Sequence, residues 1–337
     1  MRGRAGRILV GVVISAVALY FALPPRDEWA TVGAAFARVQ YGYVVPIALL
    51  SVYSVVVRCQ RWQLLLHPVG YVPMLPLVSA TAIGFFCNMV LPLRAGEVIR
   101  PVLLARRTGT PVSSVFASVL VERLLDMLTI LLFLGIVMAA VPVSEAIRRS
   151  GMVFVALAIV TVAFVVLLQR RHPATVRVLE GLVTRMPERA RPRASAALHD
   201  FIAGLQGIGN AGTLAWIGLY SIYLWSVIAA VFAVGFVACD LPVPLVTGSL
   251  ALVTVVAGAV SAPSAPGFIG TFQAGAVVAL ALFGIGRAEA IPYAFVIWAA
   301  QWATQIVLGV VFLLRENVSF RDIQAAESPD GAVQSEP

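Results

Sequence analysis

Residues 84–107 read GFFCNMVLPLRAGEVIRPVLLARR, an apolar run that is broken by proline and glycine and then joined by charged residues. Its apolar part is too short to cross a bilayer, because a membrane-spanning helix needs about 20 predominantly apolar residues. Pro92, Gly96 and Pro101 interrupt regular helix, and the backbone groups that such breaks leave unpaired are tolerated only where protein or a water-filled cavity surrounds them. The stretch therefore predicts a re-entrant segment at membrane depth, with residues 74–91 as its first half.

The composition of the whole chain indicates a membrane protein. Of its 337 residues, 60% are apolar and 12% are charged, and the mean hydropathy is +0.94, whereas a soluble domain is nearer half apolar and a quarter charged. A single hydrophobic core cannot bury this many apolar residues, because the surface of a soluble protein grows with its size and must be covered by polar groups. The composition excludes a soluble globular enzyme, a disordered chain, a collagen-like chain and a disulfide scaffold.

The net charge of +8 comes from arginine, since all 24 basic residues are Arg. A pI of about 10.0 is compatible with nucleic-acid binding, but the arginines stand at the ends of apolar runs, as positive-inside topology signals do. Anionic lipid is therefore the expected partner, and nucleic acid is not. Cys59, Cys87 and Cys239 lie far apart in apolar sequence, and their spacing fits neither disulfides nor a zinc site.

Apolar runs recur along the chain at lengths that suit membrane-spanning helices, which rise about 1.5 Å per residue through a hydrocarbon core of about 30 Å. These runs are 8–23, 41–57, 112–141, 152–168, 213–238, 243–261 and 291–314. They predict an all-α, polytopic membrane helix bundle of about eight transmembrane helices. Arg58 and Arg61 follow the second run and are interpreted as its basic inner boundary.

The segment 169–200 is the most basic part of the chain and is expected in the cytoplasm, because arginine-rich loops stay on that side. An even number of crossings before it predicts a multi-pass protein of the cell inner membrane with both termini cytoplasmic. Apolar residues recur at helical spacing in the segment, which favours an amphipathic helix on anionic headgroups or a solvated linker helix. Residues 1–316 are expected to form a single transmembrane domain, and residues 317–337 a disordered cytoplasmic tail.

A second break lies in the other half of the chain, at residues 261–275, SAPSAPGFIGTFQAG. Pro263, Pro266, Gly267 and Gly270 interrupt this segment at membrane depth. Two broken segments, one in each half, are the best sequence indication of a central transport or lipid-binding site. The alternative is a pair of ordinary proline kinks or tight connecting loops.

Charged residues concentrate after the first break and within the next apolar run: Arg94, Glu97, Arg100, Glu122, Arg123 and Asp126. Glu122 and Asp126 are four residues apart and share one face of a helix. A charge at this depth costs a few kcal/mol unless it has a partner, and an arginine from the first break is the expected partner. One interpretation is a polar cavity in which arginine holds a lipid phosphate. The other is a structural ion-pair cluster that joins two helices.

Other chemistries find no support in the sequence. GIGNAG at residues 207–212 matches a dinucleotide-binding spacing, but no buried strand precedes it. His67, His172 and His199 lack the spacing of metal ligands, and a G-x-x-x-x-G-K-[ST] phosphate loop needs a lysine, which the chain lacks. We expect no metal site, no cofactor and no catalytic residue.

Three elements carry a family resemblance: N-M-V-L-P-L-R-A-G-E-V-I-R from residue 88, V-E-R-L-L-D from residue 121 and P-S-A-P-G-F-I-G-T-F from residue 263. They resemble the lysylphosphatidylglycerol synthase transmembrane-region family, also called flippase-like membrane proteins, over about residues 8–314. The resemblance implies an inner-membrane bundle of about eight helices with re-entrant segments, which handles or flips a phospholipid or a polyprenyl-phosphate-linked lipid. The family's signature positions are here Asn88, Pro92, Arg94, Gly96, Glu97, Arg100, Glu122, Arg123, Asp126, Pro263, Pro266, Gly267 and Gly270.

The sequence departs from this family at two points. Members that synthesise lysyl-lipid carry a large soluble aminoacyl-transferase domain after the membrane part, whereas this sequence stops soon after Arg315, so synthase activity is not expected. Gln273 stands where the family often has Glu.

We therefore expect a lipid-handling protein rather than an enzyme, one that flips or binds an anionic phospholipid or a polyprenyl-phosphate-linked lipid. Arg94, Arg100 and Arg123 are predicted to bind the lipid phosphate, because guanidinium forms paired hydrogen bonds with phosphate and stays charged. The residues predicted to line the cavity and orient these arginines are Asn88, Glu97, Glu122 and Asp126. The alternatives are a subunit of an integral-membrane transferase, or a scaffold for a separate lipid-modifying enzyme, namely a glycosyl or aminoacyl transferase that acts on a lipid-linked acceptor.

Overall fold

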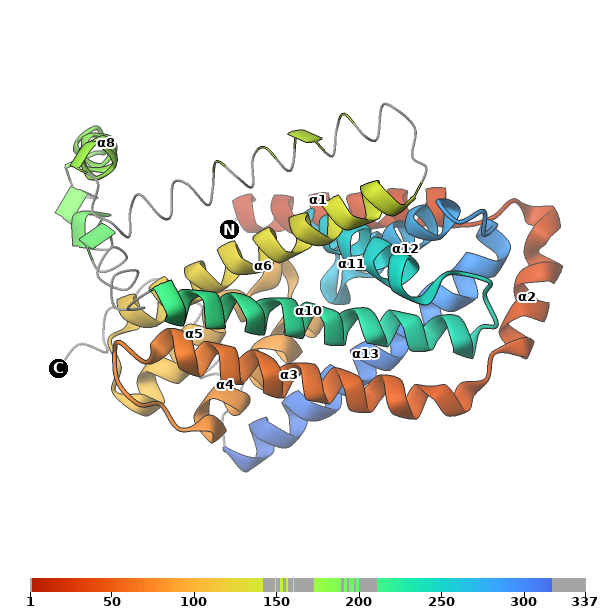
Figure 1. Cartoon of the computed structure of the whole chain (residues 1–337), viewed down its shortest axis with the longest axis horizontal. Coiled ribbons are helices and arrows are strands. Elements are labelled where there is room, and N and C mark those ends of the chain that lie inside the picture. Colours follow the sequence, from red (N-terminus) through yellow and green to blue (C-terminus); the bar gives the residue numbers. More distant parts are fainter. Residues whose placement is uncertain are drawn as a thin grey trace.

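The computed structural model describes residues 2–141, 173–188 and 211–316, together with a few short stretches between 149 and 199. Within these residues the regular elements are α-helices and short 3-10 turns (Figure 1), which confirms the all-α prediction. Most of the expected span at 152–168 and all of the expected tail at 317–337 lie outside the described residues.

Four helices are long and apolar enough to cross a membrane: α3 (Val44–Leu66), α6 (Val112–Ala140), α10 (Ala211–Ala238) and α13 (Arg287–Arg315). A fifth candidate is the pair α1 (Arg2–Ala22) and α2 (Trp29–Arg38), which the turn η1 (Arg26–Glu28) joins with a bend of 69°. The chain is thus a multi-pass membrane protein. The described residues contain four or five such spans, fewer than the eight expected.

The first break forms a helical hairpin, as the sequence predicts. Its arms are α4 (Met74–Val90) and α5 (Gly96–Thr108), and the 3-10 turn η3 (Pro92–Arg94) joins them at the tip. Leu91 has the extended conformation that a following proline favours (φ −93°, ψ 145°), so α4 ends there. Both arms return to one end of the bundle, where Arg107 pairs with Glu316, the residue that follows α13, at 2.8 Å.

The second break forms a hairpin at the opposite end of the bundle (Figure 1). Its arms are α11 (Leu245–Ser261) and α12 (Thr271–Ala281), with the turn η4 (Pro266–Phe268) between them. This is the end at which the backbone N–H of Gln40 donates to Ala238 O at 2.8 Å, just before α3 begins and where α10 ends. Residues 243–261 were expected to be a complete span; they form one arm of a re-entrant pair, because the prolines at 263 and 266 cannot continue α11.

The tips of the two hairpins meet between these ends. The turns η3 and η4 are in contact, and Arg94 Nη2 donates to Val260 O near the end of α11. Broken helices that enter from opposite sides and meet near the middle of a bilayer are the arrangement from which many transporters build their binding sites.

Each hairpin has its own apolar core. Trp62, Leu77 and Ile99 belong to the core around the first, and Phe236 and Tyr293 to the core around the second. The helix α13 contacts α4 of the first hairpin and α12 of the second, so it connects the two cores.

The first helix packs against the second hairpin. The backbone N–H of Ala265 donates to Ser15 Oγ at 2.8 Å. Gly270, at the start of α12, has φ +87°, and a side chain there would overlap Ser15 O. Glycine is needed at this position both for the backbone conformation and for the close approach of α1.

Only part of the predicted Arg-rich loop lies within the described residues. It contains α8 (Pro173–Thr184), in which Val178 is exposed while Leu179 and Val183 are half-buried. The helix predicted from the spacing of apolar residues in this segment is thus present. The proposed contact of this helix with lipid headgroups stays a prediction.

Candidate functional site

Charged residues from the three helices α3, α5 and α6 form one ion cluster. Its members are Arg58, Arg61, Arg100, Glu122, Arg123 and Asp126. Glu122 and Asp126 stand one turn apart on α6, and their side chains are 0% and 6% exposed. Arg58 and Arg61 stand three residues apart on α3. Residues at these spacings share one helix face, so the two arginines of α3 face the two carboxylates of α6.

The shortest contacts lie in the buried part of the ion cluster. Arg58 Nη1 donates to Glu122 Oε1 at 2.8 Å, and Arg61 Nη1 lies 2.7 Å from Asp126 Oδ1. Arg100 Nη2 lies 3.2 Å from Glu122 Oε2. All three arginines are buried, so both carboxylates are already neutralised by groups that do not face a solvent or lipid surface.

Two tryptophans hold these charges in position. The guanidinium of Arg100 lies 3.8 Å from the centre of the Trp62 ring, a cation–π contact, and the indole N–H of Trp62 donates to Ser118 Oγ at 2.9 Å. On the other side, the indole N–H of Trp225 on α10 donates to Asp126 Oδ1 at 2.9 Å. The ion cluster therefore joins α3, α5, α6 and α10.

Arg123 is the least buried member of the ion cluster. Its side chain is 43% exposed, and its contacts to Glu122 and Asp126 are longer, at 3.3 and 3.5 Å. Four guanidinium groups face two carboxylates, which leaves the ion cluster with a net charge of +2. Because Arg58 and Arg61 take the two short contacts, at 2.8 and 2.7 Å, part of this excess charge falls on Arg123.

Arg94 provides a second accessible cation at the tip of the first hairpin. Its guanidinium lies 5.4 Å from the centre of the Phe268 ring, at the tip of the second hairpin. The contact of Arg94 with Glu97 is 3.4 Å, and both side chains are partly exposed, at 32% and 43%. Its Nη2 donates to Val260 O, and its Nη1 has only the long contact with Glu97. Arg94 is therefore held at the tip while its charge lacks a close carboxylate partner.

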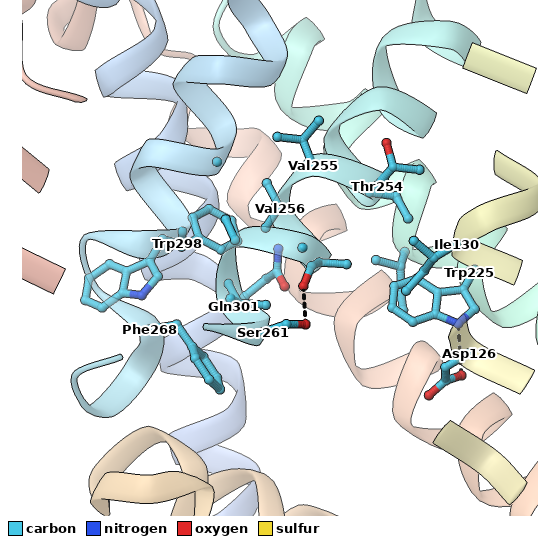
Figure 2. Close-up of a pocket in the computed structure, with 18 of the residues that line it drawn as sticks. Asp126, Ile130, Trp225, Thr254, Val255, Val256, Ser261, Phe268, Trp298 and Gln301 are labelled. Carbon is cyan, nitrogen blue, oxygen red and sulfur yellow. Dashed lines mark hydrogen bonds between the residues drawn. The ribbon is translucent and has the colours of Figure 1, made fainter. Parts of the chain in front are cut away.

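A cavity of about 1040 Å³ lies between the hairpin tips and the helices α6, α10 and α13. The charged or amide side chains on its first-hairpin and α6 walls are Asn88, Arg94, Glu97, Arg123 and Asp126. The remaining wall is largely apolar, and it includes Ile130, Leu134, Ile228, Phe232, Val256 and Val278. In Figure 2, Asp126, Trp225 and Ile130 lie on one side of the cavity, while Trp298, Gln301 and Phe268 lie on the other.

The structure separates the predicted site residues into two groups. Five of the seven predicted polar residues line the cavity, namely Asn88, Arg94, Glu97, Arg123 and Asp126. Arg100 and Glu122 do not; they pair with each other in the buried part of the ion cluster. Binding of phosphate by any of these arginines stays a prediction.

The predicted broken-helix residues shape the hairpin tips. Pro92 begins η3, Pro266 begins η4, and Pro263 lies in the non-helical link after α11. Gly267 also lines the cavity. Gly96 allows α5 to pack on α4, since a side chain there would overlap Gly84 O.

The contribution of α3 to the ion cluster was not predicted from the sequence. Arg58 and Arg61 were interpreted as an inner boundary, whereas the structure buries both as partners of the α6 carboxylates. A signal was present: the apolar residues Trp62 and Leu64–Leu66 continue the run beyond Arg61, so the arginines do not stand at its end. Trp62 and Trp225 were not predicted either. The described residues contain no group of three or more His, Cys, Asp or Glu that is able to hold a metal ion.

Comparison with known proteins gives two matches. A family model described as the lysylphosphatidylglycerol synthase TM region matches residues 8–309. The chain is also 28% identical to a protein named glycosyltransferase AglD from Haloferax volcanii, in an alignment over 345 residues that covers 94% of this chain and 54% of that protein. The chain thus spans about half the length of this curated relative.

Proposed function

The chain belongs to the lysylphosphatidylglycerol synthase TM-region family, and from this premise we propose that it binds an anionic lipid in its central cavity and moves the lipid headgroup across the membrane. The lipid is a phospholipid or a polyprenyl-phosphate-linked lipid. Its phosphate lies between Arg94 and Arg123, and its hydrocarbon chain lies along the apolar wall.

The charge balance of the ion cluster carries this proposal. The carboxylates of Glu122 and Asp126 are paired by buried arginines at 2.7–2.8 Å. Arg123, which lines the cavity, has only the longer contacts of 3.3 and 3.5 Å with them. A purely structural cluster needs no surplus charge, because each unbalanced charge at membrane depth costs a few kcal/mol. An anionic ligand removes this cost, and guanidinium groups bind phosphate through paired hydrogen bonds.

Arg100 has a positioning role in this proposal. It is buried, it does not line the cavity, and it lies between Glu122 and the Trp62 ring. By neutralising Glu122 it keeps that carboxylate from pairing closely with Arg123. The accessible arginine therefore remains available to the lipid.

The hairpins support movement of the headgroup as well as binding. Each hairpin enters from a different end of the bundle, and their tips meet beside the cavity. A headgroup held at this meeting point lies between the two halves of the membrane, and small movements of either hairpin relative to the long helices would expose it to one side or the other.

We further propose that the protein lies in the cell inner membrane with both termini in the cytoplasm. The last turn of α5 carries Arg106 and Arg107, and the last turn of α13 carries Arg315. Positive charge near the ends of membrane segments remains on the cytoplasmic side. A reporter fused near Arg106 tests this topology, and a periplasmic signal would contradict it.

Reconstitution of the full chain in liposomes tests the proposed function. Fluorescent phosphatidylglycerol and phosphatidylcholine serve as probes, and dithionite bleaching reports which leaflet they occupy. We expect bleaching of more than half of the phosphatidylglycerol probe with the wild type and loss of this effect in Arg123→Gln. The matched control is Arg38→Gln, an exposed arginine outside the cavity. Equal movement of both lipids, or full movement by the folded Arg123→Gln variant, would contradict the proposal.

A second candidate is a membrane subunit or scaffold for a transferase that acts on a lipid-linked acceptor. The observation that favours it is the relative named as a glycosyltransferase, of which this chain spans about half. In that case the cavity presents the lipid to a separate lipid-modifying enzyme. The two candidates differ in what the chain does alone: a folded chain that binds anionic lipid in detergent but moves none in liposomes supports the scaffold.

A further inference from the structure

A stripe of alternating aromatic and amide side chains lies on one face of α13. Residues 298–305 read WAAQWATQ, so Trp298, Gln301, Trp302 and Gln305 follow the i, i+3, i+4, i+7 spacing of a single helix face. All four line the cavity. We call these four residues the α13 stripe.

The position of Gln301 makes this stripe unusual. Gln301 is the central residue of the 29-residue helix α13, so it lies about 21 Å from either end at 1.5 Å per residue. An amide near the middle of a bilayer is costly unless it is hydrogen-bonded. Among the described residues, the Nε2 of Gln301 has no hydrogen-bond partner, and neither has the Oδ1 of Asn88. Both residues line the same cavity.

The two tryptophans form an aromatic platform beside these amides. The rings of Trp298 and Trp302 are stacked, with their centres 6.0 Å apart and their planes at 28°. The indole N–H of Trp298 donates to Gly267 O at 2.7 Å, which attaches the platform to the tip of the second hairpin. Gly267 is followed by Phe268, the ring that Arg94 covers. The platform thus adjoins the site proposed for the lipid phosphate.

We propose that the α13 stripe binds a sugar unit carried on the lipid phosphate, so that the ligand is a glycosylated lipid phosphate. This inference rests on the proposed function and names its substrate class. The sugar hydroxyls accept a hydrogen bond from Gln301 and donate one to Asn88, since a hydroxyl group does both. The apolar face of the sugar ring packs on the tryptophan platform, as aromatic rings provide a large flat surface for such contact.

Other headgroups fit this arrangement less well. An ammonium headgroup is attracted to aromatic rings, but here it would lie beside Arg94 and the ion cluster, whose net charge is +2. A glycerol headgroup offers hydroxyls for the two amides but no flat ring for the platform. A bare phosphate leaves both buried amides unpaired.

Binding of three lipids to the full chain in detergent, measured by native mass spectrometry, tests this inference. The probes are undecaprenyl phosphate, the same lipid with one glucose on its phosphate, and phosphatidylglycerol. We expect the wild type to bind the glucosylated lipid about tenfold more tightly than either of the others. Gln301→Leu and Trp302→Leu are each expected to remove this preference while leaving the binding of undecaprenyl phosphate unchanged.

The control variant is Val307→Ala, because Val307 lies on the same helix, is 61% exposed and does not line the cavity. It should keep the preference. Gln301→Leu removes a buried unpaired amide, so its melting temperature should not fall. Equal binding of the glucosylated and unglucosylated lipids by the wild type, or a preference that survives in Gln301→Leu, would overturn the sugar site and leave the proposed function standing. Binding of none of the three lipids would overturn both.

Discussion

The guanidinium of Arg94 lies 5.4 Å from the centre of the Phe268 ring, so the tips of two hairpins that enter from opposite ends touch through these side chains. Both residues also have positive φ, 53° for Arg94 and 59° for Phe268. Non-glycine residues rarely adopt this conformation, which costs about 1–3 kcal/mol each. The strain is located where the hairpins meet and where the cavity begins, and such strain persists only when the surrounding packing holds it.

Arg94→Gly separates the backbone role of this residue from its charge. Glycine adopts a positive φ without strain, and this gain offsets the lost contacts with Val260 and Phe268. We expect a melting temperature close to that of the wild type and an affinity for phosphatidylglycerol that is about 10- to 100-fold lower. Arg94→Lys keeps the charge without the paired geometry and should restore only part of the affinity. Normal melting together with normal binding would show that Arg94 does not bind the lipid.

Arg123→Gln is expected to weaken lipid binding without loss of stability. The side chain is 43% exposed and its ion pairs are long, so its removal leaves the short pairs of the buried carboxylates intact. We expect about a tenfold loss of affinity for anionic lipid and a change in stability below about 1 kcal/mol. Thermal denaturation and lipid titration of the same preparation measure both, with Arg38→Gln as the control. A large drop in melting temperature would instead assign Arg123 a structural role.

Glu122→Gln should have the opposite profile. Glu122 is fully buried and contacts Arg58, Arg61 and Arg100, so its neutralisation leaves three buried cations with only Asp126 to balance them. We expect a loss of about 3–5 kcal/mol in stability, seen as low yield or an early thermal transition. Glu97→Gln is the matched control, because Glu97 is 43% exposed and pairs with the partly exposed Arg94 at 3.4 Å. A Glu122→Gln protein as stable as this control would show that the ion cluster does not hold the helices together.

Gly96→Ala tests the packing of the first hairpin. An added Cβ would overlap Gly84 O on α4 and would lie 2.7 Å from Asn88 Oδ1. The helices α4 and α5 must then separate, at a cost of about 1–3 kcal/mol, and Asn88 must leave its place on the cavity wall. Gly218→Ala on α10 is the control, since nothing lies within 4 Å of its added Cβ. If both variants melt at the wild-type temperature, the close packing at Gly96 is not required.

The sequence revealed the hairpins because proline and glycine act locally. Pro92 and Pro266 end helices through the geometry of their own and the preceding residue, so the breaks are visible without knowledge of the fold. Residues 243–261 were predicted to span the membrane, because they are as apolar as a true spanning helix, but they form only one arm of the second hairpin. Hydropathy alone does not distinguish a short buried arm from a crossing helix.

The partners of the α6 carboxylates were less accessible to prediction. Glu122 and Asp126 were identified by their depth in an apolar run, but their main partners come from α3, about 60 residues earlier in the chain. Arg58 and Arg61 resemble a topology signal in sequence, and only the packing of α3 against α6 turns them inward. The α13 stripe was missed for a related reason, because four side chains on one face barely alter the mean hydropathy of a long span.

The hydrogen bond between Ser15 and Ala265 joins residues 250 positions apart in the chain, so we expect this contact to form late in assembly. The first helix enters the membrane long before the second hairpin has been synthesised, and contacts so distant in sequence form late. Until the second hairpin arrives, the ion cluster faces an incomplete chamber, since Phe268 and the end of α11 form one of its walls. The cavity proposed as the lipid site is therefore complete only after the second hairpin and α13 have packed against the earlier helices. A nascent chain carries the charges of the ion cluster well before it has all the cavity walls that surround them.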